Sequence, residues 1–348
     1  MSSGHFRGNL LRNGIAPDVL LPPLSLIFER TFDGEVRTPV FANDRIYFAS
    51  LDSHAYALNL AGDTVWAFKS GARINASLMV IDERCYFGSN DHHFYALNSH
   101  TGALLWKSPA QAAIQGNFAA AGDMVYCGAY DDHVYALEAD TGDVRWKVNV
   151  GSGVNGSPAV LDGALFVGTN GGALYALDAQ TGQTIWQTSA PGGINSTCAV
   201  SKQGVFLGTR SGHLCAFDVA TGQLHWSVDF GARIFASPAL DDEFVYMASD
   251  RGSLRKLHLC DGQLVWDAPI GRLNTGQVWS SPVLSGKVVY IGPALGLILA
   301  VDRLGGERLW SYSVEGPSSS SVAIERTRLA CSTGGNHLLV FSTIRLES

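Results

Sequence analysis

The chain has 348 residues, a formal net charge of −7, and 46% hydrophobic against 16% charged residues. This composition suits a globular protein with a large core, and the negative charge argues against a nucleic-acid or anionic-membrane partner. No apolar run approaches the roughly 18 residues of a transmembrane helix, so we expect no membrane insertion. Residues 1–7 lack the apolar core of a signal peptide, so we expect a soluble cytoplasmic protein. The alternative is an exported mature form whose signal peptide is absent from this chain.

Tryptophan recurs at a nearly fixed interval along the chain. Six of the eight tryptophans stand 40 residues apart, a seventh follows after 44, and only Trp279 lies outside the series. A fixed period of this length is typical of repeat architectures. The series consists of Trp66, Trp106, Trp146, Trp186, Trp226, Trp266 and Trp310.

In chain order, a lead-in of residues 1–23 comes first, then an expected strand at about 24–31, then the repeats. The unit at residues 154–190 shows the repeat most clearly, because turn residues such as Asp162-Gly163 separate its apolar runs. Short strands at such spacing predict an all-β protein with almost no helix. The four strands of this unit are expected at residues 154–160, 164–168, 174–177 and 184–187.

The turn before the last strand of each unit carries a recurring pair that ends in glycine. Glycine is free to adopt the left-handed conformation there. The pairs are Thr101-Gly102, Thr141-Gly142, Thr181-Gly182, Thr221-Gly222, Asp261-Gly262 and Gly305-Gly306.

The first strands of the units give a count of eight. The eighth unit ends without a tryptophan strand, but the segment at 24–31 precedes the first repeat by the right distance and places Phe28 in the tryptophan position. We therefore predict an eight-bladed β-propeller, a single domain of residues 24–344, closed by the N-terminal strand completing the C-terminal blade. Closure removes the sheet edges that otherwise promote aggregation. The first strands begin near Val36, Ile74, Ile114, Val154, Ile194, Ile234, Val278 and Ser318.

The six cysteines are scattered over five repeats, mostly where other repeats carry apolar residues. We interpret them as buried free thiols. Because no CxxC pair is present, a zinc site or a thioredoxin-like motif is not expected.

The sequence SPAVLDGALFVGTNGGALYALDAQTGQTIW (residues 157–186) resembles the pyrroloquinoline-quinone (PQQ) repeat of quinoprotein-like propellers, and the resemblance covers residues 24–344. It implies the propeller fold. It does not imply one activity, because quinoprotein dehydrogenases share the repeat with an outer-membrane assembly lipoprotein, sensor regions of bacterial kinases and a propeller fused to an adenylate-forming enzyme.

Quinoprotein dehydrogenases have features that this chain lacks. They are much longer, carry two adjacent cysteines over the cofactor, and hold calcium with Glu, Asn and Asp. No two cysteines are adjacent here, and the inner ring offers amides but few carboxylates. We therefore predict no PQQ, no calcium and no other metal.

The candidate site is the face where each blade's first strand begins. We predict a pocket at the channel mouth in which Arg37, Arg73 and Arg233 bind an anion while Phe235 and Trp279 supply apolar or stacking contact. Trp279 follows the longest connection. The alternative is a channel whose amides bind ordered water. The aligned inner-ring positions are Val36, Asn75, Gln115, Asn155, Asn195, Phe235, Trp279 and Ser318, and Asn274 and Gln277 complete the candidate set.

A second set of loops carries histidines at one aligned position in five blades. Such positions lie too far apart around a ring to share one metal ion, so we interpret them as turn-capping residues. His92, His93 and His133 are kept as candidate acids or bases. The aligned histidines are His54, His93, His133, His213 and His337.

No nucleophile, P-loop or dinucleotide motif is present in a suitable context. The leading hypothesis is therefore a non-catalytic scaffold that binds a protein or peptide through its loop face. The alternatives are a cofactor-independent enzyme of the lyase or cyclase type and a small-ligand sensor, both using the polar and aromatic pocket for a small anionic or aromatic ligand. Catalysis stays open at this point.

Overall fold

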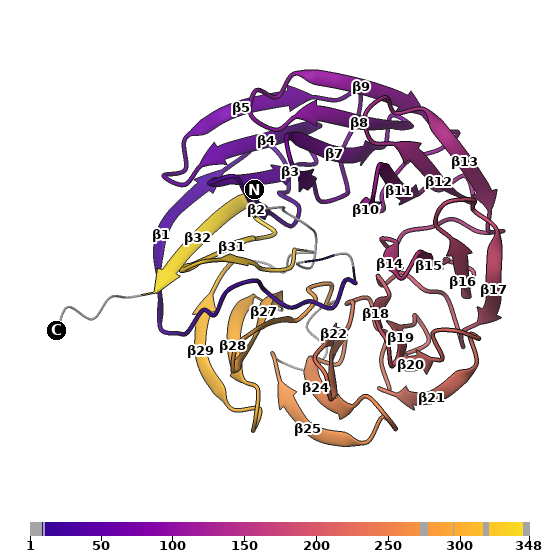
Figure 1. Cartoon of the computed structure of the whole chain (residues 1–348). Helices are drawn as coiled ribbons and strands as arrows, with labels where there is room; N and C mark the ends of the chain where they lie inside the picture. Colours follow the sequence, from indigo (N-terminus) through magenta and orange to yellow (C-terminus); the bar gives the residue numbers. More distant parts are fainter. Residues whose placement is uncertain (1–8, 10, 272–277, 295, 316–319, 344–348) are drawn as a thin grey trace.

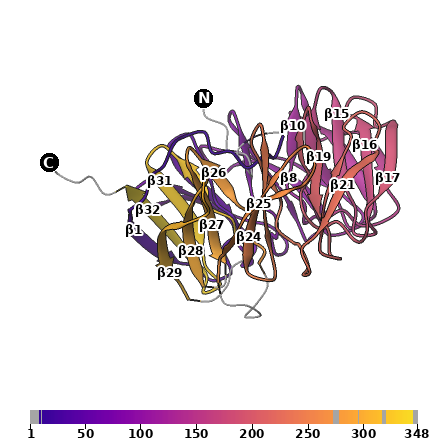
Figure 2. The ribbon, with the colours of Figure 1, turned by 90° about the horizontal axis from the view of Figure 1, so that it is seen from below.

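The computed structural model describes residues 9, 11–271, 278–294, 296–315 and 320–343. They form eight four-stranded antiparallel sheets around a central channel, with no helix in the described ranges (Figure 1). The predicted all-β, eight-bladed propeller is thereby confirmed. The view in Figure 2 shows the blades standing side by side around the ring.

The first four blades follow one another without interruption, each running from an inner to an outer strand. Blade 1 consists of β2 (Val40–Ala42), β3 (Arg45–Ala49), β4 (His54–Asn59) and β5 (Thr64–Lys69). Blade 2 consists of β6 (Met79–Ile81), β7 (Arg84–Ser89), β8 (His93–Asn98) and β9 (Leu104–Pro109). Blade 3 consists of β10 (Ala119–Ala121), β11 (Met124–Gly128), β12 (His133–Glu138) and β13 (Val144–Asn149). Blade 4 consists of β14 (Ala159–Leu161), β15 (Ala164–Gly168), β16 (Ala173–Asp178) and β17 (Thr184–Ser189).

The other four blades continue this order, and the last one takes its outer strand from the N-terminus. Blade 5 consists of β18 (Ala199–Ser201), β19 (Gly204–Gly208), β20 (His213–Phe217) and β21 (Leu224–Asp229). Blade 6 consists of β22 (Ala239–Leu240), β23 (Phe244–Ser249), β24 (Ser253–His258) and β25 (Leu264–Pro269). Blade 7 consists of β26 (Val283–Ser285), β27 (Val288–Ala294), β28 (Leu297–Asp302) and β29 (Arg308–Ser313). Blade 8 consists of β30 (Ala323–Glu325), β31 (Arg328–Ser332), β32 (His337–Thr343) and β1 (Leu24–Thr31).

The middle strands are buried on both faces because each blade lies between two others. Strand β15 is therefore an almost continuous apolar run, while the outermost strand β17 alternates exposed and half-buried residues. A register shift between β16 and β17 pairs Ala176 with Trp186 but Leu177 with Thr184. The extra residue, Ile185, is 53% exposed, so the bulge turns the tryptophan inward at the expense of an exposed isoleucine.

The regular tryptophans join neighbouring blades. Trp146 Nε1 in blade 3 donates a hydrogen bond of 3.1 Å to the carbonyl of Ala179 in blade 4. Its indole lies against Gly182, where φ is +74° and an added Cβ would stand 2.8 Å from Trp146 Cδ2. The tryptophan and the Thr-Gly turn recur with the same period because the tryptophan of one blade packs against the turn glycine of the next. The same contact recurs at Trp66, Trp106, Trp186, Trp226 and Trp266.

The ring closes through the N-terminal strand. Strand β1 pairs antiparallel with β32, from Leu24 opposite Thr343 to Thr31 opposite His337. Phe28 lies against Gly62 of blade 1, where an added Cβ would stand 3.1 Å from its ring. The predicted closure, with Phe28 in the tryptophan position, is confirmed.

The segment before β1 crosses the end of the channel at which the first strands finish (Figure 1). Its carbonyls at Leu11, Asn13 and Gly14 accept hydrogen bonds from successive blades 5, 6 and 7. Arg12 is fully buried and donates to the carbonyls of Phe118 and Pro158 in blades 3 and 4. The segment therefore packs against the ring, and the boundary between a lead-in (1–23) and a domain (24–344) stays a prediction.

Candidate functional site

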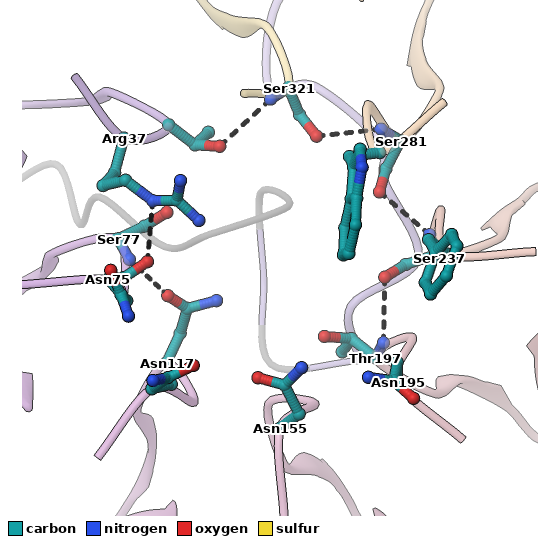
Figure 3. A pocket seen from close by; sticks show the side chains of 14 residues that line it. Arg37, Asn75, Ser77, Asn117, Asn155, Asn195, Thr197, Ser237, Ser281 and Ser321 are labelled. Carbon is teal, nitrogen blue, oxygen red and sulfur yellow. Dashed lines mark hydrogen bonds between the residues drawn. The ribbon is translucent and has the colours of Figure 1, made fainter. Parts of the chain in front are cut away.

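A pocket of about 130 Å³ lies at the opposite end of the channel, where the first strands begin. All eight blades contribute to it, in two layers (Figure 3). The outer layer consists of Arg37, Asn75, Gln115, Asn155, Asn195, Phe235 and Trp279. These are predicted residues, but Arg37 occupies the ring position in blade 1 to which the sequence alignment assigned Val36. Val36 is fully buried in the core beneath it.

The inner layer is a chain of hydrogen bonds that runs from blade to blade. The backbone N–H of Thr197 donates to Ser237 Oγ at 2.9 Å, and the N–H of Ser237 donates to Ser281 Oγ at 2.9 Å. Each of these two hydroxyls thereby satisfies a buried backbone donor of the preceding blade, whereas Ser157 Oγ accepts from the side-chain amide of Asn117. The complete chain joins Ser77, Asn117, Ser157, Thr197, Ser237, Ser281, Ser321 and Thr38. Figure 3 shows the links other than those of Ser157.

The sequence prediction missed this inner layer, although the signal was present. Ser, Thr or Asn recurs with the repeat period two residues after the outer-ring position, as at Asn117, Ser157 and Thr197. The series of small residues that the crowded channel wall requires, such as Gly116, Gly156 and Ser196, lies one position earlier, so the polar side chains looked like part of the turn. A search for periodic side-chain acceptors rather than for small residues would have found the layer.

Arg37 connects blades 1 and 2 at the point between Thr38 and Ser77. Its Nε donates to the carbonyl of Asn75 at 2.8 Å, and its Nη1 lies 3.1 Å from Glu35 Oε1. Burial lowers the pKa of Arg37, and Glu35 partly offsets this effect. The guanidinium therefore contributes a positive charge to the pocket wall from a fixed position (Figure 3).

Blades 6 and 7 contribute an aromatic shelf, Phe235 and Trp279, to the pocket wall. The rings of Phe235 and Trp279 stack with centroids 4.3 Å apart and planes 17° apart, and Trp279 is 37% exposed. Arg233 lies over Phe235, with Cζ 5.5 Å from the ring centroid, and its Nε lies 3.3 Å from Asp250 Oδ2. Burial raises the pKa of Asp250, while hydrogen bonding from Val278 and the charge of Arg233 oppose the rise. The shelf is therefore apolar, cationic at one edge and accessible.

Two amides face the opening from the side opposite Arg37. Figure 3 shows the Asn155 side chain directed into the pocket and Asn195 beside it. Within the described residues, the buried Oδ1 atom of Asn195 has no hydrogen-bond partner. A buried carbonyl oxygen without a donor is costly, so this atom is suited to accept a hydrogen bond from a bound group.

The remaining predicted residues are distributed differently. Arg73 and Arg233 are exposed and, unlike Arg37, do not line the pocket. Gln115 lines it, and its Nε2 is 3.4 Å from Asn90 Oδ1. Asn274 and Gln277 lie outside the described residues.

None of the candidate histidines lines the pocket. His93 Nδ1 lies 2.7 Å from the carbonyl of Asp91, and His133 Nδ1 lies 2.6 Å from that of Asp131. Each histidine is thus held within its own turn, and His92 is exposed with φ +66°. Their assignment as acids or bases stays a prediction.

The side chains that line the mouth do not offer the ligands that a calcium-bound quinone requires. Calcium prefers several oxygen ligands that include carboxylates, and the described pocket lining contains none. No group of three His, Cys, Asp or Glu side chains within the described ranges is placed to hold a metal. The pocket of about 130 Å³ is also smaller than the roughly 300–1,000 Å³ of most small-molecule sites.

Comparison with known proteins extends these observations. The family model described as outer membrane protein assembly factor BamB matches residues 90–196 and 170–343. No curated protein sequence matches the chain. Within the described residues, no helix is long and apolar enough to cross a membrane.

Solved structures share the fold over nearly the whole chain. BamB from Moraxella catarrhalis is 18% identical with a TM-score of 0.78, covering 92% of this chain and 100% of that chain. A europium-containing methanol dehydrogenase is 14% identical with a TM-score of 0.79, covering 96% of each chain. Quinohemoprotein alcohol dehydrogenase from Comamonas testosteroni is 12% identical with a TM-score of 0.80, covering 97% of this chain and 80% of that chain. At these identities the likeness shows the fold alone.

Proposed function

Because the chain belongs to the PQQ-like repeat family whose model is the outer membrane protein assembly factor BamB, we propose that it is a non-catalytic scaffold. It binds a protein or peptide partner through the loop face around the channel mouth. Its partner binds without PQQ, calcium or another cofactor. The cytoplasmic location expected from the sequence, with export as the alternative, stays a prediction.

The exposed aromatic shelf is the observation that carries this proposal. The seven periodic tryptophans lie on the outer strands, whereas Trp279 presents 37% of its surface at the mouth. It stacks on Phe235, and the Arg233 guanidinium lies over the Phe235 ring. Tryptophan and arginine are the residues most enriched among those that dominate binding energy in protein interfaces. A stacked pair also loses little conformational entropy when a partner binds.

The size and rigidity of the pocket support a macromolecular partner. A volume of about 130 Å³ suits one inserted side chain better than a drug-sized molecule. The hydrogen-bonded inner layer holds the floor in place before binding. We therefore expect one side chain of the partner to enter the mouth while its neighbours lie on the shelf.

The polar side of the same pocket supports a second candidate, the binding of a small anionic or aromatic ligand by a sensor. Arg37 supplies a fixed positive charge, and Asn195 offers an oxygen that has no donor among the described residues. A lyase or cyclase would need an acid or base at the pocket. The candidate histidines lie in their own turns instead, which disfavours catalysis.

Affinity capture from native lysate tests the proposal, with both proteins and metabolites identified by mass spectrometry. The bait is the wild-type chain, compared with an Arg233→Ala/Phe235→Ala/Trp279→Ala variant. Ile185→Ala is the matched control, because it removes an exposed apolar side chain from the outer strand of blade 4, which does not line the mouth. Equal thermal midpoints would show that all three baits are folded.

We expect a specific protein to be retained by the wild type and by Ile185→Ala and to be lost from the triple variant. A partner retained equally by all three baits would place the binding surface elsewhere and contradict the proposal. A metabolite retained by the first two baits, with no protein, would favour the sensor.

A further inference from the structure

One repeat departs from the others at the centre of its third strand. In blade 6 the position is occupied by Lys256, on β24. Six of the other blades carry alanine there, and blade 8 carries Val340. The alanines are Ala57, Ala96, Ala136, Ala176, Ala216 and Ala300.

Lys256 changes the contact between blades 6 and 7. Lys256 is only 5% exposed, and its Nζ donates to the carbonyl of Arg303 at 3.0 Å. Trp266 Nε1 donates to the same carbonyl at 3.4 Å, longer than the 2.8–3.1 Å at the five preceding tryptophans. Lys256 and Trp266 thus donate to the same carbonyl. In the blades that carry alanine at the position of Lys256, no side chain from that position competes with the tryptophan.

A cavity of about 620 Å³ adjoins this lysine. It lies where the turn after the first strand of blade 6 meets the turns after the first and third strands of blade 7, at the other end of the ring from the channel mouth. The volume falls within the range of about 300–1,000 Å³ that is typical of small-molecule sites. Its apolar lining includes Phe244, Tyr246 and Leu304, and Leu304 is 83% exposed.

The charges in the cavity are unequally paired. Arg303 is engaged by three acceptors: Asp241 Oδ2 at 2.6 Å, Tyr246 OH at 3.1 Å and the Gly286 carbonyl at 2.7 Å. Asp241 is thereby neutralised. An ammonium can donate three hydrogen bonds. Among the described residues that of Lys256 donates to one carbonyl, and the ring centroids of Phe244 and Tyr246 lie 3.8 and 5.7 Å from its Nζ. The carboxylates of Asp241, Glu243 and Asp302 act on this charge without a hydrogen bond to it.

We propose that this cavity binds a small monocarboxylate with an aromatic or branched apolar body. The carboxylate accepts a hydrogen bond from Lys256 Nζ, and the apolar body lies on Phe244 and Leu304. A cationic ligand would meet the buried ammonium. The exposed carboxylates of Asp242 and Glu243 line the same cavity and disfavour multiply charged anions. The proposal does not depend on a partner at the channel mouth.

Isothermal titration of the full chain with 4-phenylbutyrate tests this site. The matched ligands are the neutral amide of the same acid and the dianion phenylsuccinate. The variant is Lys256→Ala, which restores the residue of six other blades, and Lys256→Met keeps the length of the side chain. Lys147→Ala removes an exposed lysine from another blade as a control.

We expect 4-phenylbutyrate to bind the wild type and Lys147→Ala about tenfold or more tightly than it binds either Lys256 variant, because the lost hydrogen bond is charge-assisted. The amide and phenylsuccinate should bind the wild type correspondingly more weakly than the monocarboxylate. Equal affinity for acid and amide, unchanged binding by folded Lys256 variants, or no binding at millimolar concentration would overturn the proposal. The comparison of ligands on the wild type decides even where a variant fails to fold.

Discussion

Replacing Gly182 by alanine tests the contact that joins each blade to the next. An added Cβ at Gly182 would stand 2.8 Å from Trp146 Cδ2 and 3.0 Å from Val148 Cγ2. Gly163 is a matched control, because its φ of +79° is close to the +74° of Gly182 but nothing lies within 4 Å of an added Cβ. The two alanine variants therefore share the backbone strain and differ in the contact.

The expected magnitudes follow from these distances. Left-handed backbone costs an alanine about 1–2 kcal/mol, offset by about 0.4–1 kcal/mol from the reduced entropy of the unfolded chain. Gly163→Ala should thus lower the free energy of unfolding by at most about 1.5 kcal/mol. Gly182→Ala should cost about 1–3 kcal/mol more, because the indole is overpacked. With an unfolding entropy of about 0.7 kcal/mol/K for a chain of this length, the extra loss corresponds to a Tm difference of about 1.5–4 °C.

Differential scanning calorimetry of the two variants measures this difference. A Trp146→Leu background completes the test, since removing the indole should bring the costs of the two glycine substitutions closer together and leave only the contact with Val148 Cγ2 between them. Equal Tm values for Gly163→Ala and Gly182→Ala in the wild-type background would refute the interpretation that the glycine of the Thr-Gly turn makes room for the tryptophan of the preceding blade.

Three further results are expected. Arg12→Leu should lower the free energy of unfolding by about 1–3 kcal/mol, seen as a reduced Tm, because it removes the donor to two buried carbonyls; an unchanged Tm would contradict this. Hydrogen bonds from Thr181 and Thr221 hold the pKa of Asp178 and Asp218, respectively, below the usual range. The stabilisation of the fold by these two carboxylates is therefore present above their unfolded-state pKa and is lost as the pH falls through their folded-state pKa. An Asp178→Asn/Asp218→Asn variant, with the residue that other repeats use in this turn, should therefore lose less Tm than the wild type between neutral and acidic pH; parallel Tm curves would count against it. A thiol reagent such as Ellman's should label Cys260 alone in the native protein and all six cysteines after unfolding, because the other five are buried; rapid labelling of a second thiol would disagree.

The periodic part of the structure could be predicted from the sequence because it is repeated. Each tryptophan and each turn glycine occupies an equivalent environment, so the pattern averages over local differences. The same reasoning found Phe28, although it is a different residue at the far end of the chain from its blade. The channel-mouth residues followed from their aligned positions, and most of the described ones line a single pocket.

The unrepeated features could not be predicted in this way. An offset of one residue separates Val36 from Arg37, and periodicity alone does not resolve it where a connection varies in length. Arg12 is buried by tertiary contacts with blades 3 and 4, which nothing in its own segment signals. Lys256 stood within a recognisable strand, but only the structure shows the cavity beside it.

The pairing of β1 with β32 has a consequence for biosynthesis. Leu24 leaves the ribosome about 319 residues before its partner Thr343. At about 5–20 residues per second, about 15–60 s pass between their synthesis. Seven blades can assemble in that interval, while β1 waits without its neighbour and its backbone groups are available to other chains. A nonsense mutation in the final repeat would make that wait permanent, so we expect its product to be removed by quality control even though most of the ring has been made.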